Sequence, residues 1–428
     1  MVIDRTNIMT GTMKLHFIRQ VIISILLLIS SASDAQPEMI HLGITGNSTS
    51  NTNPSISVTW CSGSGESEQF VKYGISPAMG KIESAGKQSF HEMVLFNASL
   101  KNLKPATTYY YQCGSETGGW SEVYSFKTEP QKKRLTTFKV GIIGDTQNNT
   151  DNEEFQKTNE IVSLLKSFSP SLTLHMGDIV ENGSITASWT EFLRVSQKLN
   201  ATVPLMPVLG NHDIVNTIGD QFQDPFPDFY NLFNLPGDEV NYSFTYGNVH
   251  FVAVFSGYAQ AAAEIGKVKF KKDSPEYKWL DNDLSQARKN KKIDWIVVFT
   301  HYPVYSFGWS NIAIWKQSLS PLLEKYKVDL CLAGHRHVYE RHFQISNGIP
   351  VKKENSRNFS SSDGTIYITN GTGGGTPQGT GGMDLPTMAF TPDTRMYNFA
   401  VMTVANKSIT YEVFDQRGTK IDWFTIEK

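Results

Sequence analysis

Hydrophobic and polar positions follow two different patterns along this chain. Between Glu38 and Thr128 the apolar residues form short runs separated by turns, and residues 56–60 alternate apolar and polar side chains. Alternation with a period of two is typical of a strand with one buried face, and no helical period interrupts the series. Further strands are expected at 71–74, 92–96, 107–112 and 123–127. Residues 38–129 therefore predict an all-β sandwich.

The pattern changes after a polar, basic linker at residues 130–134. Residues 151–168 carry apolar side chains at helical spacing, and Ser274 followed by Pro275 is typical of the start of another helix. Strands are expected between and after these helices, at 137–143, 172–176, 295–300, 328–333 and 365–369. Alternating strands and helices predict an α/β domain over residues 136–428.

Residues 1–35 have the composition of a secretory signal peptide. A basic segment at 14–19 precedes an apolar stretch at 21–29, and small residues follow up to an expected cleavage site after Ala35. The alternative is an uncleaved anchor, but the apolar stretch is shorter than the roughly 20 residues that span a bilayer. We expect a mature chain without a membrane span, secreted or delivered to an acidic endolysosomal or vacuolar compartment.

Composition narrows the functional classes. The formal net charge is −2 and only 19% of residues are charged, which argues against a general nucleic-acid binder with a basic face. Three cysteines cannot form a multi-bridge framework. Cys61 and Cys113 have the option of pairing, whereas Cys331 lies in an apolar strand and is expected to be a buried free thiol. Glycosylation is expected at six Asn-X-Ser/Thr sequons: Asn47, Asn97, Asn200, Asn241, Asn358 and Asn406.

Five short blocks carry the candidate chemistry, and most of them follow an apolar strand. They are Gly144-Asp145, Gly177-Asp178, Gly210-Asn211-His212-Asp213, His301 and Gly334-His335-Arg336-His337. Ligands in α/β sheets gather at the carboxyl ends of strands, so these groups are expected to converge. In an extended His-X-His, both imidazoles point to one face. Mixed oxygen and nitrogen ligands suit zinc, iron or manganese better than calcium or magnesium alone. The other histidines near strands, His175, His250 and His342, are expected to be core or surface residues.

This ordered series resembles the calcineurin-like metallophosphoesterase superfamily and, within it, the purple acid phosphatase family. Supporting stretches are 241–251, 277–280 and 333–341, and the N-terminal region is similar to the family's fibronectin type III-like domain through Trp60, 71–74, Leu103, 107–111 and 124–128. The resemblance covers nearly the whole mature chain. It implies a fibronectin type III-like β-sandwich at 38–129, followed by a catalytic domain at 136–428 with two mixed β-sheets sandwiched by helices.

The resemblance also implies a role for each block. The first metal would be held by Asp145, Asp178 and His337, and the second by the bridging Asp178 with Asn211, His301 and His335. A metal-bound hydroxide would attack phosphorus, and His212 would be the general acid that protonates the leaving group. The implied cofactors are two metal ions, iron and/or zinc or manganese.

Two positions depart from the family pattern. Glu181 stands where the family has the tyrosine whose tyrosinate on ferric iron gives the purple colour. Gln147 stands where many non-purple members of the superfamily have a histidine ligand, so it either completes the first metal site through its amide oxygen or merely faces the cleft. Loss of a phenolate charge disfavours trivalent iron. We therefore expect a protein that is not purple and uses divalent zinc, manganese or iron.

The sequence is compatible with three functions. The first is an exported phosphomonoesterase, acid phosphatase-like, that acts on a small phosphate ester. The alternative enzyme is a metallophosphodiesterase acting on nucleotides or phospholipid headgroups. A third reading is a surface recognition protein with a vestigial metal site, which predicts missing ligands, whereas only the tyrosine is absent. The aromatic stretch 302–309 either forms a rim that favours aromatic leaving groups or packs within its own loop.

Overall fold

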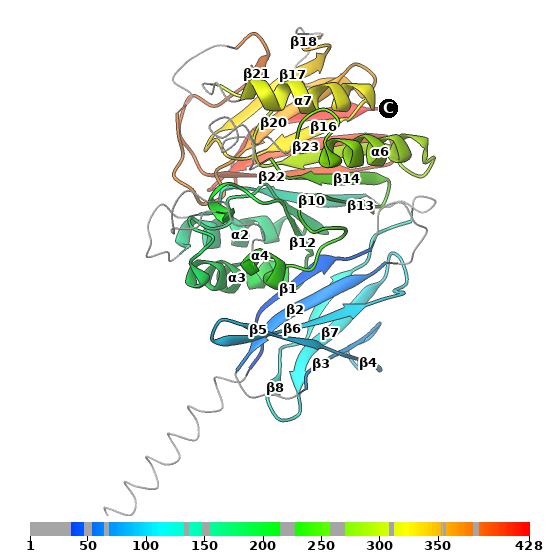
Figure 1. Cartoon of the computed structure of the whole chain (residues 1–428), viewed down its shortest axis with the longest axis vertical. Helices are drawn as coiled ribbons and strands as arrows, with labels where there is room; N and C mark the ends of the chain where they lie inside the picture. Colours follow the sequence, from blue (N-terminus) through cyan, green and yellow to red (C-terminus); the bar gives the residue numbers. More distant parts are fainter. Residues whose placement is uncertain are drawn as a thin grey trace, which may run out of the picture.

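A computed structural model of the chain describes residues 36–46, 54–63, 68–131, 137–147, 155–214, 227–256, 270–307, 312–351, 353, 357–379 and 385–428. The expected signal peptide and the sequon at Asn47 lie outside these residues. Within them, no helix is both long enough and apolar enough to cross a membrane. Figure 1 shows an N-terminal β-domain beneath a larger domain of sheets and helices.

The N-terminal domain consists of two antiparallel sheets, as the alternating pattern predicted. The first has the order β1-β2-β6-β5, with β1 at Glu38–Ile44, β2 at Ile56–Ser62, β6 at Met93–Leu100 and β5 at Gly86–Phe90. The second contains β4 (Lys81–Ser84), β3 (Phe70–Gly74), β7 (Thr108–Ser115), β8 (Gly119–Trp120) and β9 (Tyr124–Lys127), with β9 paired to β7. Trp60 and Tyr111 are fully buried in the core of this domain.

The larger domain contains two mixed sheets flanked by helices, which confirms the predicted fold class. One sheet has the order β12-β11-β10-β22-β23-β24-β19, made of Leu205–Pro207, Leu172–His175, Phe138–Ile143, Asn398–Val404, Ser408–Asp415, Lys420–Glu427 and Asn358–Ser360. The other has the order β13-β14-β15-β16-β20-β17-β18, made of Tyr242–Tyr246, Val249–Val254, Trp295–Thr300, Leu330–Ala333, Thr365–Asn370, Tyr339–Ser346 and Ile349–Pro350, with β21 (Met388–Phe390) paired to β17.

Helices cover the outer face of each sheet. They are α2 (Gln156–Ser167), α3 (Thr186–Asn200), α4 (Pro227–Leu232), α6 (Pro275–Lys289) and α7 (Ile312–Lys325), with a short 3-10 turn, η2, at His212–Ile214. The side chain of Ser274 accepts a hydrogen bond from the Tyr277 backbone N–H (3.1 Å), which confirms the predicted start of α6. The predicted helix at 151–168 is α2, which ends at Ser167.

Alternation along the central strands explains the layered arrangement. In β15, Ile296 and Val298 pack with α6 and α7, whereas Val297 and Phe299 pack in the core that includes the first sheet. A strand buried on both faces reads as a continuous apolar run, as residues 295–300 do. The two sheets therefore form the inner layers, and the helices form the outer ones (Figure 1).

Parallel pairing brings the candidate loops to one edge. Strands β10, β11 and β12 are parallel to one another, as are β14, β15, β16 and β20. Their carboxyl ends meet at the same edge of each sheet, and every candidate block follows one of these ends.

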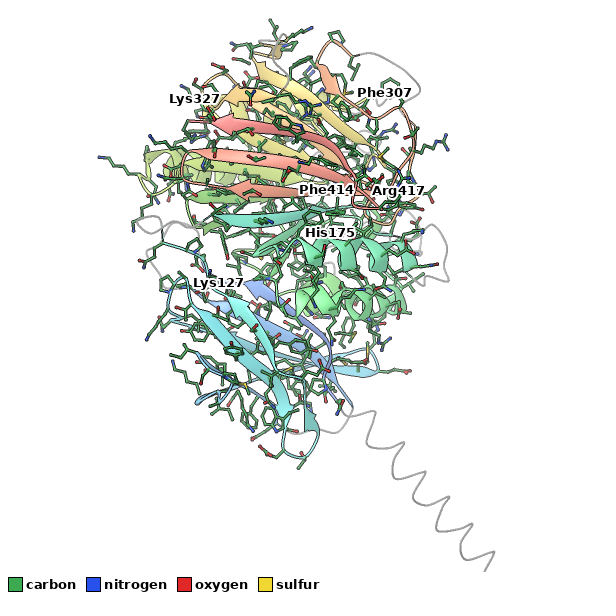
Figure 2. All side chains as sticks on the ribbon, turned by 180° about the vertical axis from the view of Figure 1, so that it is seen from behind. Lys127, His175, Phe307, Lys327, Phe414 and Arg417 are labelled. Atoms are coloured by element: carbon green, nitrogen blue, oxygen red, sulfur yellow. The ribbon has the colours of Figure 1, made fainter. Side chains whose placement is uncertain are left out.

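The two domains are joined by polar and apolar contacts. Tyr111 Oη donates to the Ala201 carbonyl oxygen (2.7 Å), and the Ile40 backbone N–H donates to Gln197 Oε1 (2.9 Å). Figure 2, which views the molecule from the opposite side, shows Lys127 at the end of the β-domain that faces the larger domain. One buried apolar cluster runs through both domains, so the N-terminal domain rests on α3 and its neighbours.

The structure also bears on the cysteines and sequons. Cys61, Cys113 and Cys331 are all buried and free, so the option of a Cys61–Cys113 bridge is not taken. The glycosylation expectation fails for Asn200, because this residue is 2% exposed and its Nδ2 donates to Ser196 Oγ. Of the remaining sequons, Asn358 and Asn406 are exposed, whereas Asn97 and Asn241 are partly buried.

Candidate metal centre

Sharp turns after three strands position the first ligating groups. Asp145, Asp178 and His335 all have left-handed backbones, with φ of 53°, 51° and 67°. Two glycines beside them are required by close approach: a Cβ on Gly210 would collide with Asp178 Oδ1, and a Cβ on Gly334 would collide with Asp145 Oδ2. The glycine that precedes each polar block therefore lets two loops approach within contact distance.

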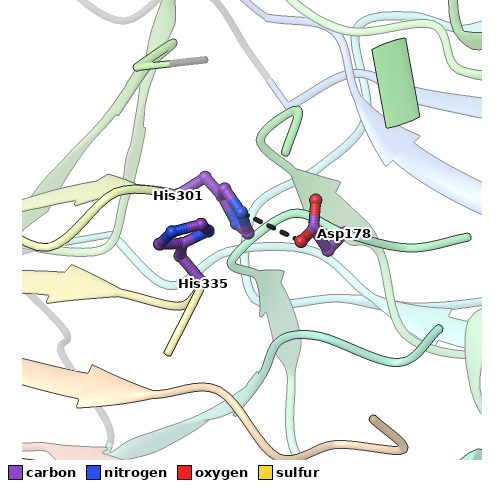
Figure 3. Close-up of side chains that lie close together, drawn as sticks. All are labelled: Asp178, His301 and His335. Carbon is purple, nitrogen blue, oxygen red and sulfur yellow. Dashed lines mark ion pairs between the residues drawn. The ribbon is translucent and has the colours of Figure 1, made fainter. Parts of the chain in front are cut away.

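One group of side chains, the second cluster, consists of Asp178, Asn211, His301 and His335. His301 Nε2 lies 3.1 Å from Asp178 Oδ2 and 3.0 Å from Asn211 Oδ1, and His335 Nδ1 lies 3.0 Å from the same Asn211 oxygen. Donor atoms of Asp178, His301 and His335 lie within 4.8 Å of one another. Figure 3 shows the ion pair between His301 and Asp178, with the imidazole of His335 beside that of His301.

The other group, the first cluster, consists of Asp145, Gln147, Asp178 and His337. His337 Nε2 lies 3.6 Å from Asp145 Oδ1 and 3.3 Å from Gln147 Nε2. Gln147 Nε2 in turn lies 3.3 Å from Asp178 Oδ2. Since the same Asp178 oxygen faces His301, this carboxylate stands between the two clusters.

The hydrogen bonds of His301 show that the second cluster fits a cation. Its Nδ1 lies 2.8 Å from the Met176 carbonyl oxygen, which can only accept, so this nitrogen carries a proton. In the neutral ring, Nε2 then carries a lone pair that faces the oxygens of Asp178 and Asn211. This contact is favourable only if a positive charge lies between Nε2 and these oxygens. Although burial lowers the pKa of His301, the Asp178 and Asp145 carboxylates outweigh it and raise the pKa to about 9. A metal ion bound to Nε2 would supply the same positive charge as a proton on this nitrogen.

The other two imidazoles are held neutral. Burial, aided by the nearby His301, lowers the pKa of His335 well below its ordinary value, and burial likewise lowers the pKa of His337. His337 Nδ1 donates to the Thr376 carbonyl oxygen (3.0 Å), which leaves Nε2 as the lone pair facing Asp145. A neutral imidazole oriented by a carbonyl is the form that ligates metal.

The backbone conformation that carries His335 and His337 to the site differs from the one expected from the sequence. Residues 334–338 form a bend with His335 in the left-handed region, not an extended strand with alternating side chains. The His335 backbone N–H donates to both oxygens of Asp145 (2.8 and 3.0 Å), which fixes this bend. The two imidazoles therefore enter different clusters, His335 the second and His337 the first.

His212 lies at the side of the centre. Its backbone N–H donates to Asp178 Oδ1 (2.8 Å), and its Nδ1 donates to the Glu181 carbonyl oxygen (2.8 Å) with the Glu181 carboxylate 3.3 Å away. The side chain is 33% exposed, and in the described part of the chain no partner is recorded for Nε2. Glu181, which stands at the expected tyrosine position, therefore contacts His212.

The remaining histidines have structural partners, as expected. His175 Nδ1 accepts from the Gly177 N–H, and its Nε2 contacts Thr146 Oγ1, so the ring braces the loops that follow β10 and β11 (Figure 2). Burial lowers the pKa of His175 to about 3, which keeps it neutral. His250 pairs with Asp283 (2.7 Å), and His342 contacts Thr387 (3.0 Å).

Asp213 has a role that its place in the block did not reveal. Its Oδ1 accepts from the Ile179 and Val180 N–H groups, and its Oδ2 accepts from the Gly210 N–H. This buried carboxylate ties the loop after β11 to the loop after β12, so it holds Asp178 and Asn211 in register. Its position in Gly-Asn-His-Asp was the only sequence signal.

A cleft of about 730 Å³ opens onto both clusters. One side is lined by Gln147, Asp178, Asn211, His212, His335, Arg336 and His337, and the other by Thr376, Pro377, Gln378, Gly379 and Arg395. Sequence reasoning assigned no role to Arg336 or Arg395. The proposed aromatic rim is not found in the described residues, because Tyr302, Tyr305 and Phe307 are buried and pack within the fold. Trp309 lies outside them.

Gln147 provides a test of the first cluster. It is 1% exposed, and its Oε1 is buried without a hydrogen-bond partner in the described residues. A half-turn of the amide would direct this oxygen toward Asp178 and His337. We expect Gln147→Ala to weaken metal binding about 10- to 100-fold, measured by competition with a chromophoric chelator.

Gln147→Glu separates a ligand from a hydrogen-bond donor. If Gln147 Oε1 is a metal ligand, the charge gained in Gln147→Glu should tighten metal binding. If Gln147 instead donates a hydrogen bond to Asp178, the new carboxylate beside Asp178 should weaken metal binding. Gln156→Ala, at an exposed position on α2, is the matched control and should leave affinity unchanged. Weaker binding by Gln147→Glu would contradict the ligand assignment.

Comparison with known proteins agrees with the geometry. Residues 138–339 match the family described as calcineurin-like phosphoesterase, and residues 37–128 match the description purple acid phosphatase, N-terminal domain. The chain is 27% identical over 329 residues to probable purple acid phosphatase 20 of Arabidopsis thaliana, a match that covers 72% of this chain and 70% of that protein. It is 24% identical over 370 residues to probable inactive purple acid phosphatase 1 of the same plant, covering 74% and 58%.

A solved structure shares the fold. Purple acid phosphatase PPD1 from yellow lupin (Lupinus luteus) seeds matches with a TM-score of 0.76 at 20% identity, over 92% of this chain and 74% of that one. A match over 92% of the chain necessarily includes parts of both the N-terminal sandwich and the two-sheet domain. The chain is therefore a purple acid phosphatase-like protein, with that family's N-terminal domain followed by a calcineurin-like metallophosphoesterase domain.

Proposed function

We propose that this protein hydrolyses phosphate monoesters at a binuclear metal centre. The observation that carries the proposal is the position of Asp178, whose Oδ2 lies 3.1 Å from His301 Nε2 in one cluster and 3.3 Å from Gln147 Nε2 in the other. A carboxylate shared by two sets of donors is suited to bridge two cations. We assign Asp145, Gln147, Asp178 and His337 to the first metal, and Asp178, Asn211, His301 and His335 to the second.

The residues of the cleft supply the remaining chemistry. When bound, two metal ions would lower the pKa of a water molecule, neutralise phosphoryl oxygens and fix the attack geometry. His212 lines the cleft, and its Nδ1 proton is held by the Glu181 carbonyl, so Nε2 is the atom left to give a proton to the leaving oxygen. The Glu181 carboxylate lies 3.3 Å from Nδ1, on the side of the ring away from Nε2.

The metals of the proposed centre are divalent. Tyrosinate ligation of ferric iron is absent, because Glu181 occupies that position and its carboxylate contacts His212. The assigned donors comprise two carboxylates, two amides and three imidazoles, a set that suits zinc, manganese or ferrous iron. A fully loaded sample should therefore lack a strong visible charge-transfer band.

Two other functions make different predictions in one assay. After loading with zinc, manganese or ferrous iron, p-nitrophenyl phosphate and bis(p-nitrophenyl) phosphate are compared as substrates with the same leaving group. A larger kcat/KM for the monoester supports the proposal, whereas a larger value for the diester favours a phosphodiesterase of nucleotides or phospholipid headgroups. Failure to turn over either ester at full metal occupancy would indicate a recognition protein, as the name of the inactive relative allows.

We also propose that the chain follows the secretory pathway. The proposal is supported by the leader-like composition of residues 1–35 and by the exposure of the sequons at Asn358 and Asn406. Expression in a eukaryotic host should yield secreted protein that begins after Ala35 by N-terminal sequencing. An uncleaved, membrane-retained product would contradict it.

A further inference from the structure

Two arginines line the cleft beside the proposed centre. Arg336 lies between His335 and His337 in the chain, and Arg395 precedes β22 on the opposite wall with Gly379. A Cβ on Gly379 would come within 3.4 Å of Arg395 Nε, so the guanidinium lies against this part of the wall. Neither residue belongs to the ligand set or to the proton donor.

Both arginines differ from the others in the described part of the chain. There Arg194, Arg288, Arg341, Arg357 and Arg417 each lie within ion-pair distance of an aspartate or glutamate. Within the same residues, no ion pair is recorded for Arg336 or Arg395, and Arg336 Nε is buried without a hydrogen-bond partner. Burial raises the pKa of the Glu340 carboxyl, and the nearby charge of Arg336 acts to lower it, but Glu340 supplies no acceptor to Arg336 Nε. A buried donor atom without an acceptor is costly unless a ligand supplies one, whereas Arg395 is exposed and available from the cleft.

The position of Arg336 is fixed by its backbone. Its N–H donates to the Gly334 carbonyl oxygen (2.8 Å), and its own carbonyl accepts from the Val338 N–H (2.7 Å). The same bend holds His335 and His337 in their clusters, so the backbone from which the Arg336 side chain enters the cleft lies between two proposed ligands. Guanidinium groups bind phosphate and carboxylate groups through paired, charge-assisted hydrogen bonds.

We propose that Arg336 and Arg395 bind a second anionic group of the substrate, distinct from the phosphate that is hydrolysed. This inference rests on the proposed function and deepens it. It assigns the substrate to phosphomonoesters that carry another phosphate or a carboxylate on the leaving group. The cleft of about 730 Å³ has room for a small bisphosphate or phosphorylated acid.

Matched substrates test the proposal. The first pair is 4-carboxyphenyl phosphate and 4-carbamoylphenyl phosphate, which differ in the charge of the leaving group. The second pair is propane-1,3-diol bisphosphate and 3-hydroxypropyl phosphate, which differ in a second phosphate. For the loaded wild-type protein we expect kcat/KM to be on the order of 10-fold higher for the more anionic member of at least one pair. The pair that shows the preference identifies the anion as carboxylate or phosphate.

For each variant, the quantity compared is kcat/KM for the more anionic substrate divided by kcat/KM for its partner. A loss of turnover that affects both substrates equally leaves this ratio unchanged. Arg336→Gln and Arg395→Gln should each reduce the ratio toward one, and Arg395→Lys should restore part of it. Lys407→Gln removes the same charge from the turn after β22, at the far end of β10 from Asp145, and should leave the ratio unchanged. Metal content is measured for every variant, because Arg336 adjoins two proposed ligands.

A binding measurement separates this inference from the proposed function. Titration calorimetry of the loaded protein with propane-1,3-diylbisphosphonate and with propylphosphonate requires no hydrolysis. Tighter binding of the bisphosphonate, lost in Arg395→Gln, supports the subsite even if no ester is turned over. Equal ratios in wild type and both glutamine variants, with equal binding of the two phosphonates, would overturn the subsite while leaving the phosphatase assignment intact.

Discussion

Asp178→Asn is expected to lower kcat/KM for a phosphate monoester by on the order of 10³-fold or more. The carboxylate touches both clusters: Oδ2 faces His301 and Gln147, and Oδ1 accepts the His212 backbone N–H. The amide keeps the shape of the side chain but removes the charge that would be shared by two cations. Turnover, together with elemental analysis, measures the effect, and at least one equivalent of metal should be lost.

The matched control is Asp281→Asn. Asp281 pairs with Lys325 on the exposed face of α6 and lies outside the cleft, so this variant loses the same charge without touching the centre. Circular dichroism should show both variants folded, because Asp178 lies in a loop and not in a core strand. Wild-type turnover by Asp178→Asn at full metal content would remove the site assignment.

His212→Gln is expected to lower kcat by about 10²- to 10⁴-fold for esters with poor leaving groups, and far less for activated aryl esters. An alkoxide needs a proton as the bond to phosphorus breaks, whereas a stable phenolate leaves without one. The measurement is the dependence of log kcat on leaving-group pKa, which should become steeper in the variant. Metal content should not change, since His212 is not among the assigned ligands.

A control histidine distinguishes proton donation from general disturbance. His91, on the turn between β5 and β6, is partly exposed and pairs with Asp228 away from the cleft. His91→Gln should retain the wild-type leaving-group dependence. If His212→Gln lowers turnover equally for all leaving groups, the His212 side chain positions the loop through its hydrogen bond to the Glu181 carbonyl and does not donate a proton.

Much of the fold was predictable because the strands next to the site are short, nearly continuous apolar runs. Residues 295–300 and 365–369 match β15 and β20 to within one residue. The C-terminal strands β22, β23 and β24 were not predicted. They pair with one another as consecutive antiparallel strands, but β22 joins the sheet through β10, which lies about 260 residues earlier in the chain.

The site was predictable in membership but not in geometry. Asp145, Asp178, Asn211, His301, His335 and His337 do converge, since each follows a strand whose carboxyl end reaches the same edge. The bend at His335 was missed because a left-handed residue is set by its contact with Asp145, which is a tertiary interaction. Arg336 and Arg395 were missed for a similar reason: which cations line the cleft without an ion pair among the described residues is set by the tertiary arrangement.

The pairing of β10 with β22 has a consequence for biosynthesis. Phe138 lies opposite Val404, so the strand that leads to Asp145 gains one of its two neighbours only after residues 398–404 have been translated. A nascent chain that has emerged as far as His337 carries every proposed ligand but lacks the strand that steadies the first of them. Acquisition of metal by the first cluster is therefore expected to follow synthesis of residues 398–404.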